Sequence, residues 1–205
     1  MARITRESWL QVLTTCGVRA VTAASWAPLF ERHVQDDAFS DGRRELHHFV
    51  GQALTESGNL ERLVENLSYS PQRLCEVWPK RFPGVAAAVP YAWNPEALAE
   101  KVYGGRMGNT MPGDGFKYLG RGIPMITGAD NYRLLQRLTA LPLLDFPVLL
   151  ENKAVALRCA VLWWEKRVPD SALVTVERVT RLVQGGQLAL DHRRRLTDLA
   201  AGALV

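Results

Sequence analysis

The stretch HHFVGQALTESGNLERLVENLSYSP, residues 47–71, holds the most informative pattern in this chain. Its apolar side chains recur at the spacing of one face of an α-helix, namely Leu46, Phe49, Val50, Ala53 and Leu54. Glu56 lies three residues after Ala53 on that face, so the helix is expected to direct a carboxylic acid inward. Gly58 can end the helix, and Glu65 follows on a separate segment. The sequence therefore predicts two carboxylates that reach one region from different backbone elements.

Paired carboxylates of this kind suit the hydrolysis of a glycosidic bond. That reaction needs a protonated acid at the leaving oxygen and an ionised carboxylate that activates water or attacks the sugar. Burial against an apolar helix face favours the protonated form, and a wetter loop position can favour the ionised one. Alternatively, Glu56 is satisfied by a helix terminus and Glu65 is an ordinary surface charge, because isolated pairs of glutamates are common. Spacing alone leaves both interpretations open.

Length and composition are those of a globular protein. A chain of 205 residues with 47% hydrophobic residues can bury a core, and this length predicts one domain, with room for two lobes around a cleft. No apolar run reaches the length of about 18 residues that a membrane span needs, and the start MARITRESWLQ lacks a signal-peptide core. Cys16, Cys75 and Cys159 have no metal-ligand spacing and are expected to be buried thiols.

The charge balance is mildly basic. A net charge of +4 and a pI near 9.1 favour an anionic surface or substrate, but the excess is too small to require a nucleic acid. The densest basic cluster is His192, Arg193, Arg194 and Arg195, near the C-terminus. Most of these arginines are expected on a solvated helix face.

Capping signals predict further helices. The expected N-terminal caps are Ser8, Ser25, Asp41, Ser70, Asn94 and Ser171. A proline in the first turn follows Ser70 and Asn94, which strengthens both predictions. Further helices are expected at residues 131–138, 152–167 and 171–183, with a last one running to about residue 203.

A glycine-rich segment lies between these helices. Residues 104–128 carry eight glycines, which suits loops that need positive φ or a close approach to a ligand, and we expect a cleft wall there. The apolar run at residues 123–126 is expected to be a strand or a buried extended segment. The overall prediction is a mainly α fold with at most one very short β element.

Five segments resemble successive motifs of a known family, in its order and at compatible spacings: TESGNL, ENLSYSP, YAWNPEALAEKVYGGRMGN, GDGFKYLGRG and ITGADNY. The family comprises the glycoside hydrolase family 19 chitinases and related phage endolysins. The resemblance is strong over residues 41–138 and weaker to residue 193. It implies a lysozyme-like, mainly α fold over residues 1–205 as a single domain with a cleft between two lobes. It also favours the catalytic interpretation of Glu56 and Glu65.

Carried over by position, the resemblance implies that Glu56 is the general acid and Glu65 the general base of an inverting hydrolysis. Thr127 stands where the family has a Ser or Thr that helps to hold the water. The implied substrate-binding residues are Asn131, Tyr118, Gln184 and Arg193. Thr127 and two of the substrate-binding positions have structural alternatives. Thr127 can cap a helix, Asn131 can bond to backbone, and Tyr118 can belong to the core.

Three positions depart from the family pattern. Met125 replaces a substrate-binding glutamine, Thr55 a histidine before the acid, and Gln184 an asparagine. These departures weaken the match to a chitin-binding pattern and leave the acid, the base and Thr127 in place. We therefore expect a peptidoglycan-degrading endolysin. The alternatives are a secreted antibacterial toxin, a chitinase, and a catalytically inactive wall-binding module.

The expected partners are peptidoglycan or chitin strands, with neither a nucleic acid nor stable membrane insertion. The resemblance implies no metal and no organic cofactor. The protein is expected to be a monomer that is made without a signal peptide in a host cytoplasm. It would reach the cell wall in the periplasm through a membrane lesion made by a separate protein.

Overall fold

The computed structural model describes residues 2–204 and confirms a mainly helical fold. Within these residues, β structure is limited to two isolated bridges, Val64 with Arg121 and Arg121 with Ile126. The run at residues 123–126 therefore forms no strand. Gly122 at φ +74° and Met125 at φ +50° turn the backbone away from an extended path.

The described residues divide into two compact units. Unit 1 comprises residues 2–63, Gly122–Met125 and residues 148–204, and unit 2 comprises Val64–Arg121 and Ile126–Pro147. Neither unit is one continuous segment. The single domain over residues 1–205, with a cleft between lobes, stays a prediction.

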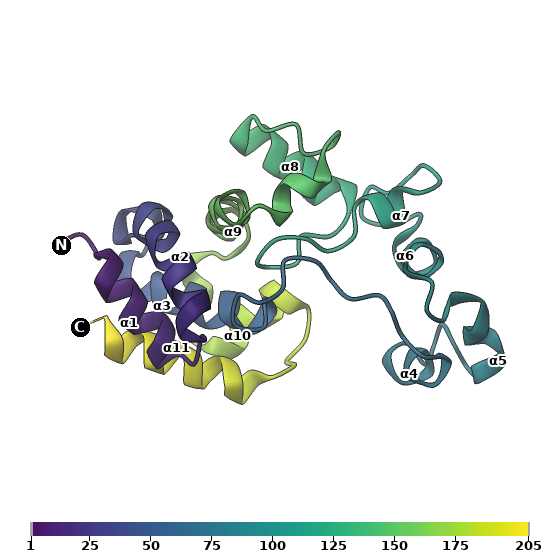
Figure 1. Ribbon diagram of the computed structural model, residues 1–205, viewed down its shortest axis with the longest axis horizontal. Helices are drawn as coiled ribbons and strands as arrows, with labels where there is room; N and C mark the ends of the chain where they lie inside the picture. Colours follow the sequence, from purple (N-terminus) through teal and green to yellow (C-terminus); the bar gives the residue numbers. More distant parts are fainter. Residues whose placement is uncertain (1, 205) are drawn as a thin grey trace. The chain divides into compact units, whose positions relative to one another are not determined.

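Unit 1 contains the N-terminal and C-terminal helices (Figure 1). Its elements are α1 (Arg6–Thr15), α2 (Ala20–His33), η1 (Asp36–Ala38), α3 (Gly42–Glu56), α9 (Lys153–Arg167), η4 (Asp170–Ala172), α10 (Val176–Gln184) and α11 (Leu190–Ala203). The helix α3 packs against α11, and α1 packs against both α2 and α11. Phe49 of α3 contacts Trp164 of α9 edge to face, with ring centroids 5.5 Å apart. These contacts bury the apolar face of α3 that the sequence predicts.

Unit 2 is built from shorter helices. They are α4 (Pro71–Val77), α5 (Val85–Ala88), η2 (Val89–Tyr91), α6 (Pro95–Tyr103), α7 (Asp114–Lys117) and α8 (Ala129–Thr139), and η3 (Pro147–Glu151) begins at its boundary. One of its apolar cores is formed by Leu67, Leu74, Phe82, Ala88, Leu98, Ala99, Val102 and Leu119. The aromatic pairs Tyr69 with Trp78 and Phe82 with Tyr91 extend this core.

The predicted caps Ser70 and Asn94 are confirmed, since each side chain accepts a backbone N–H of its helix at 3.2 Å. The prediction that Ser8 caps α1 is wrong, because Thr5 caps this helix by accepting the Ser8 N–H. The prediction that Ser25 is a cap is also wrong, because Ser25 lies inside α2 and donates to the Thr22 carbonyl.

The caps of two other helices also differ from the prediction. Asp41 occupies the N-cap position of α3 but makes no side-chain cap bond, and Glu45 accepts the Asp41 N–H at 3.0 Å instead. Ser171 lies within η4, and Thr175 is the residue that caps α10.

The three cysteines differ in how deeply they are buried. Cys16 and Cys159 are buried and Cys75 is half-buried. Burial raises the thiol pKa of Cys16 to about 11 and of Cys159 to about 12.

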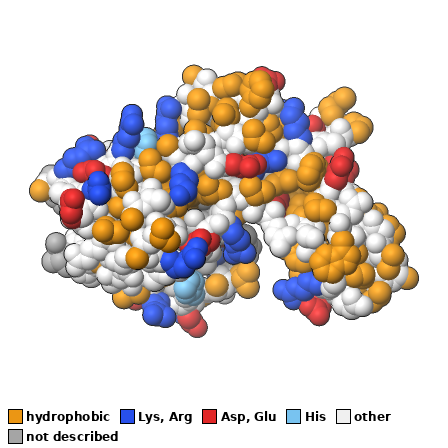
Figure 2. All heavy atoms as spheres, viewed as in Figure 1, with side chains coloured by type: hydrophobic (Ala, Val, Ile, Leu, Met, Phe, Trp, Pro, Cys, Tyr) orange, Lys and Arg blue, Asp and Glu red, His pale blue; other side chains and the backbone are white. Residues whose placement is uncertain are grey.

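On the face in Figure 2, Lys and Arg side chains are dispersed among apolar and acidic ones. Between residues 2 and 204, no helix is long and apolar enough to span a membrane.

Candidate active site

Glu56 is the last residue of α3, and its side chain is 17% exposed. It lines a small, mostly apolar cavity together with Phe49, Ala53 and Trp163. The inward direction of this carboxylate agrees with the helical spacing of the sequence. The site therefore holds the Glu56 carboxyl group among apolar side chains.

Arg193 of α11 is the charged partner of Glu56. Its Nη2 donates to Glu56 Oε1 at 2.6 Å, and its Nε donates to the Leu188 carbonyl at 3.0 Å. The guanidinium is buried, so this side chain departs from the solvated face expected for the basic cluster. The resemblance implies a substrate-binding role for Arg193, and in the structure this side chain pairs with Glu56. A guanidinium at this position forms a charge-assisted hydrogen bond with the Glu56 carboxylate.

The turn after Glu56 has an unusual backbone. Gly58, Asn59 and Leu60 have φ values of +57°, +58° and +65°. A buried leucine rarely adopts this left-handed conformation, which costs free energy and persists only where its surroundings enforce it. Ser57 Oγ enforces it by donating to the Ala53 carbonyl at 2.7 Å and accepting the Leu60 N–H at 2.9 Å. The sequence indicated only that Gly58 ends the helix.

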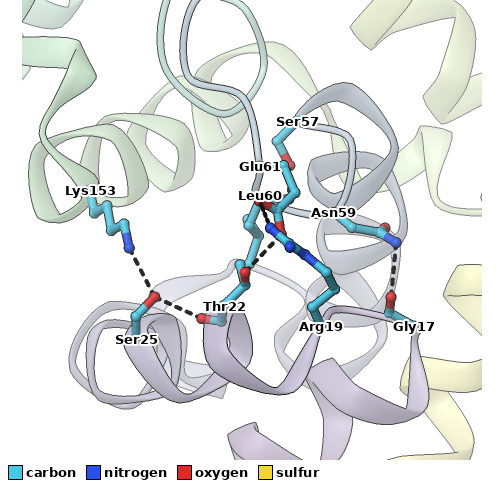
Figure 3. Close-up of polar contacts among 9 residues, drawn as sticks. All are labelled: Gly17, Arg19, Thr22, Ser25, Ser57, Asn59, Leu60, Glu61 and Lys153. Atoms are coloured by element: carbon cyan, nitrogen blue, oxygen red, sulfur yellow. Dashed lines mark hydrogen bonds and ion pairs between the residues drawn. The ribbon is translucent and has the colours of Figure 1, made fainter.

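Side chains from α2 and the loop before it fix the same turn, as Figure 3 shows. The Glu61 carboxylate accepts hydrogen bonds from Arg19 Nη2 at 2.6 Å and from Thr22 Oγ1 at 2.7 Å. The Arg19 hydrogen bond lowers the pKa of Glu61 to about 2, so this anchor stays ionised. Asn59 Nδ2 donates to the Gly17 carbonyl at 3.1 Å. Because the Arg19 pair is exposed, its main effect is to orient the turn rather than to stabilise the fold.

Glu65 belongs to unit 2, where three contacts hold it. Its Oε2 accepts from the Tyr103 hydroxyl at 2.7 Å, and its Oε1 accepts the Gly120 N–H at 2.5 Å. Its own N–H donates to the Gly120 carbonyl at 2.9 Å. Burial, together with the Glu65 carboxylate, raises the pKa of Tyr103, so its hydroxyl remains a donor. No local sequence pattern identifies Tyr103 and Gly120 as partners of Glu65.

Thr127 and Glu65 both lie close to Gly120. A Cβ added to Gly120 would be 3.1 Å from Glu65 Oε1 and 3.2 Å from Thr127 Oγ1. Gly128, the residue after Thr127, is the N-cap of α8. The role of Thr127 in holding a water stays a prediction.

Asn131 and Tyr118 both make hydrogen bonds to the backbone of unit 2. Asn131 Nδ2 donates to the Thr127 carbonyl at 2.8 Å and so fixes the backbone of a site residue. Tyr118 is buried, its hydroxyl donates to the Leu144 carbonyl at 3.1 Å, and its ring packs on Tyr132. Tyr118 thus packs within unit 2, and the substrate-binding roles of Tyr118 and Asn131 stay predictions.

Gln184 and Met125 both belong to unit 1. Gln184 is the last residue of α10, and its buried Oε1 has no hydrogen-bond partner within residues 2–204. Met125 is half-buried in the segment Gly122–Met125. Neither position contradicts a substrate-binding role, which stays a prediction for Gln184.

The predicted residues thus form two groups. Arg193 and Gln184 share unit 1 with Glu56, and Thr127 shares unit 2 with Glu65. A carboxylate separation of roughly 6.5–9.5 Å, as an inverting hydrolysis needs, stays a prediction. In the described part of the chain, no group of three or more His, Cys, Asp and Glu could hold a metal.

Comparisons with known proteins extend this description. No family model matches the chain. A Haemophilus influenzae protein named glycosyl hydrolase family 19 domain-containing protein is 37% identical over 150 residues, which cover 72% of this chain and 74% of that protein.

Two solved structures are similar in fold. Chitinase C from Streptomyces griseus HUT6037 has a TM-score of 0.58 at 16% identity, with 98% of this chain and 92% of that chain covered. A bacterial family 19 chitinase has a TM-score of 0.53 at 19% identity, with 97% and 95% covered. Both agree with the lysozyme-like, mainly α fold that the sequence motifs imply.

Proposed function

This chain belongs to glycoside hydrolase family 19, and we propose that it is an endolysin that hydrolyses β-1,4 bonds between N-acetylated amino sugars of peptidoglycan. The observation that best supports this proposal is that both predicted carboxylates are held by dedicated donors. Arg193 contacts Glu56, and the Tyr103 hydroxyl contacts Glu65. Ordinary surface glutamates do not need such partners.

In the proposed mechanism, Glu56 gives its proton to the leaving oxygen while the glycosidic bond breaks. Glu65 takes a proton from a water that attacks the anomeric carbon on the opposite face of the sugar. The configuration at that carbon is inverted. The mechanism requires the two carboxylates to flank one sugar with room for the water between them.

The partners of each carboxylate support these roles. Arg193 balances the charge that develops on Glu56 as its proton leaves. Tyr103 and Gly120 fix the Glu65 carboxylate, and Thr127 stands next to it with a hydroxyl that can orient the attacking water. In this way the rotamer of the base is set before substrate binds.

Two features favour peptidoglycan over chitin. Met125 offers a thioether where a glutamine would bond to a sugar, and the loss of such a hydrogen bond costs about 1 kcal/mol. The net charge of +4 attracts the lactyl and peptide carboxylates of peptidoglycan, which chitin lacks. The second candidate is a chitinase, which the two similar solved structures favour because both are chitinases.

The proposal includes where the enzyme works. It would be made in a host cytoplasm and act as a monomer on the periplasmic cell wall, after a separate protein has opened the membrane. The mildly basic charge suits that anionic polymer.

The test compares initial rates on purified peptidoglycan and on a chitin hexamer. Faster cleavage of peptidoglycan is expected, and mass spectrometry of its products identifies the sugar at the new reducing end. If the hexamer is cut as fast or faster, the chitinase candidate replaces the endolysin. An anhydro product would indicate a lytic transglycosylase and would contradict hydrolysis.

A further inference from the structure

A chain of buried polar groups in unit 1 leads away from Glu56. Gln52, Thr180 and Arg193 are only 2%, 0% and 2% exposed. Arg193 Nη1 donates to Gln52 Oε1 at 2.5 Å, and Gln52 Nε2 donates to Thr180 Oγ1 at 3.0 Å. Thr180 Oγ1 in turn donates to the Val176 carbonyl at 2.7 Å. These contacts connect α10 through α3 to the arginine that pairs with Glu56.

The hydroxyl of Thr180, at the end of this series of hydrogen bonds, determines the direction of each of them. A hydroxyl has one proton, and Thr180 uses it on the Val176 carbonyl, so Thr180 can only accept from Gln52. The amide of Gln52 must therefore turn its NH₂ toward Thr180 and its oxygen toward Arg193. The reverse orientation would place an NH₂ donor against a guanidinium, which has no acceptor.

The same series of hydrogen bonds determines how the Arg193 guanidinium is oriented toward Glu56. The guanidinium is planar and rigid, and its three nitrogens have three different partners: Leu188, Gln52 and Glu56. A fixed bond at Nη1 therefore also fixes the position of Nη2, the atom that contacts Glu56. Without the bond at Gln52, the guanidinium could rotate about its remaining contacts.

We propose that Gln52 and Thr180 are positioning residues for the general acid, because they hold Arg193 in the orientation that contacts Glu56. This inference rests on the proposed role of Glu56 as the acid. Neither residue needs to touch the substrate. Their effect should therefore fall on kcat and leave KM unchanged.

Thr180→Val tests the inference, because valine keeps the shape of threonine and lacks the hydroxyl. We expect kcat on purified peptidoglycan to fall about tenfold with KM unchanged, and Thr180→Ser to keep kcat within about twofold of wild type. Thr197→Val is the matched control. Thr197 is a buried threonine of α11 whose Oγ1 has no hydrogen-bond partner among the described residues, so its kcat should not change.

A second variant covers the case in which Thr180→Val does not fold. Gln52→Glu keeps the side-chain size and gives Arg193 a second carboxylate that competes with Glu56. We expect a lower kcat with an unchanged KM here as well.

The outcomes separate this inference from the proposed function. If Thr180→Val or a folded Gln52→Glu keeps the wild-type kcat while Glu56→Gln is inactive, the positioning role is overturned and the acid assignment stands. Equal loss of kcat in Thr180→Ser and Thr180→Val would also overturn it, because serine keeps the hydroxyl. If Glu56→Gln itself stays active, the proposed function fails.

Discussion

Replacing Gly120 by alanine tests how closely the candidate base is held. The Gly120 N–H donates to Glu65 Oε1, and an added Cβ would lie 3.1 Å from that oxygen and 3.2 Å from Thr127 Oγ1. Ordinary van der Waals contacts of a Cβ span 3.4–4 Å, so both side chains must move by a few tenths of an ångström. The φ of Gly120 is not in the left-handed region, so alanine meets steric crowding without backbone strain.

The size of the effect follows from this shift. A misplacement of about 1 Å at a catalytic group can cost about a hundredfold in rate, so a few tenths of an ångström should cost about tenfold in kcat. That loss corresponds to about 1.4 kcal/mol in the activation barrier. Crowding at this buried site should lower the free energy of unfolding by about 1 kcal/mol, which leaves the protein folded.

Initial rates on purified peptidoglycan and thermal unfolding would be measured for the wild type, Gly120→Ala and Gly84→Ala. Gly84 is the matched control, because it lies in the same unit and an added Cβ there meets nothing within 4 Å. Gly84→Ala should keep the wild-type kcat. If Gly120→Ala is as active as Gly84→Ala, close positioning of Glu65 by Gly120 is refuted.

Three further predictions concern pH, stereochemistry and salt. Burial beside Glu45 raises the pKa of Glu165 from 4.5 to about 7, so its stabilising contribution is complete below pH 4.5 and is lost as the pH rises through about 7. Glu165→Gln should therefore lose less melting temperature than the wild type between pH 5 and pH 8, and equal losses would contradict this. An NMR time course on a β-linked oligosaccharide should show the α-anomer first, whereas the β-anomer would indicate retention. Added salt should slow cleavage of peptidoglycan more than that of a chitin hexamer, and parallel slowing would argue against charge attraction.

Local signals predicted helix starts only where the chain offered one clear cap. Ser70 and Asn94 are each followed by a proline that cannot lie in a helix interior without cost, and both predictions hold. Ser8 was a misleading signal, because it is the residue whose N–H the true cap Thr5 accepts. Ser25 misled because its hydroxyl bonds back to the Thr22 carbonyl inside α2.

The candidate site was predictable where helical spacing sufficed. The direction of Glu56 follows from the apolar face of α3. Gln52 lies one turn earlier and is also buried, but the helical spacing does not distinguish it from other polar residues. The partners of Glu65 were not predictable in this way, because Tyr103 and Gly120 are 38 and 55 residues away in sequence. Tertiary packing brings them together, and no local pattern records it.

The most direct test of the central claim is the rate at which Glu56→Gln releases reducing ends from purified peptidoglycan. Glutamine keeps the size of the side chain but cannot donate the proton of a carboxylic acid to the leaving oxygen. We predict a loss of at least about a hundredfold relative to wild type in a protein that stays folded. A folded Glu56→Gln protein that releases reducing ends at close to the wild-type rate would contradict the account.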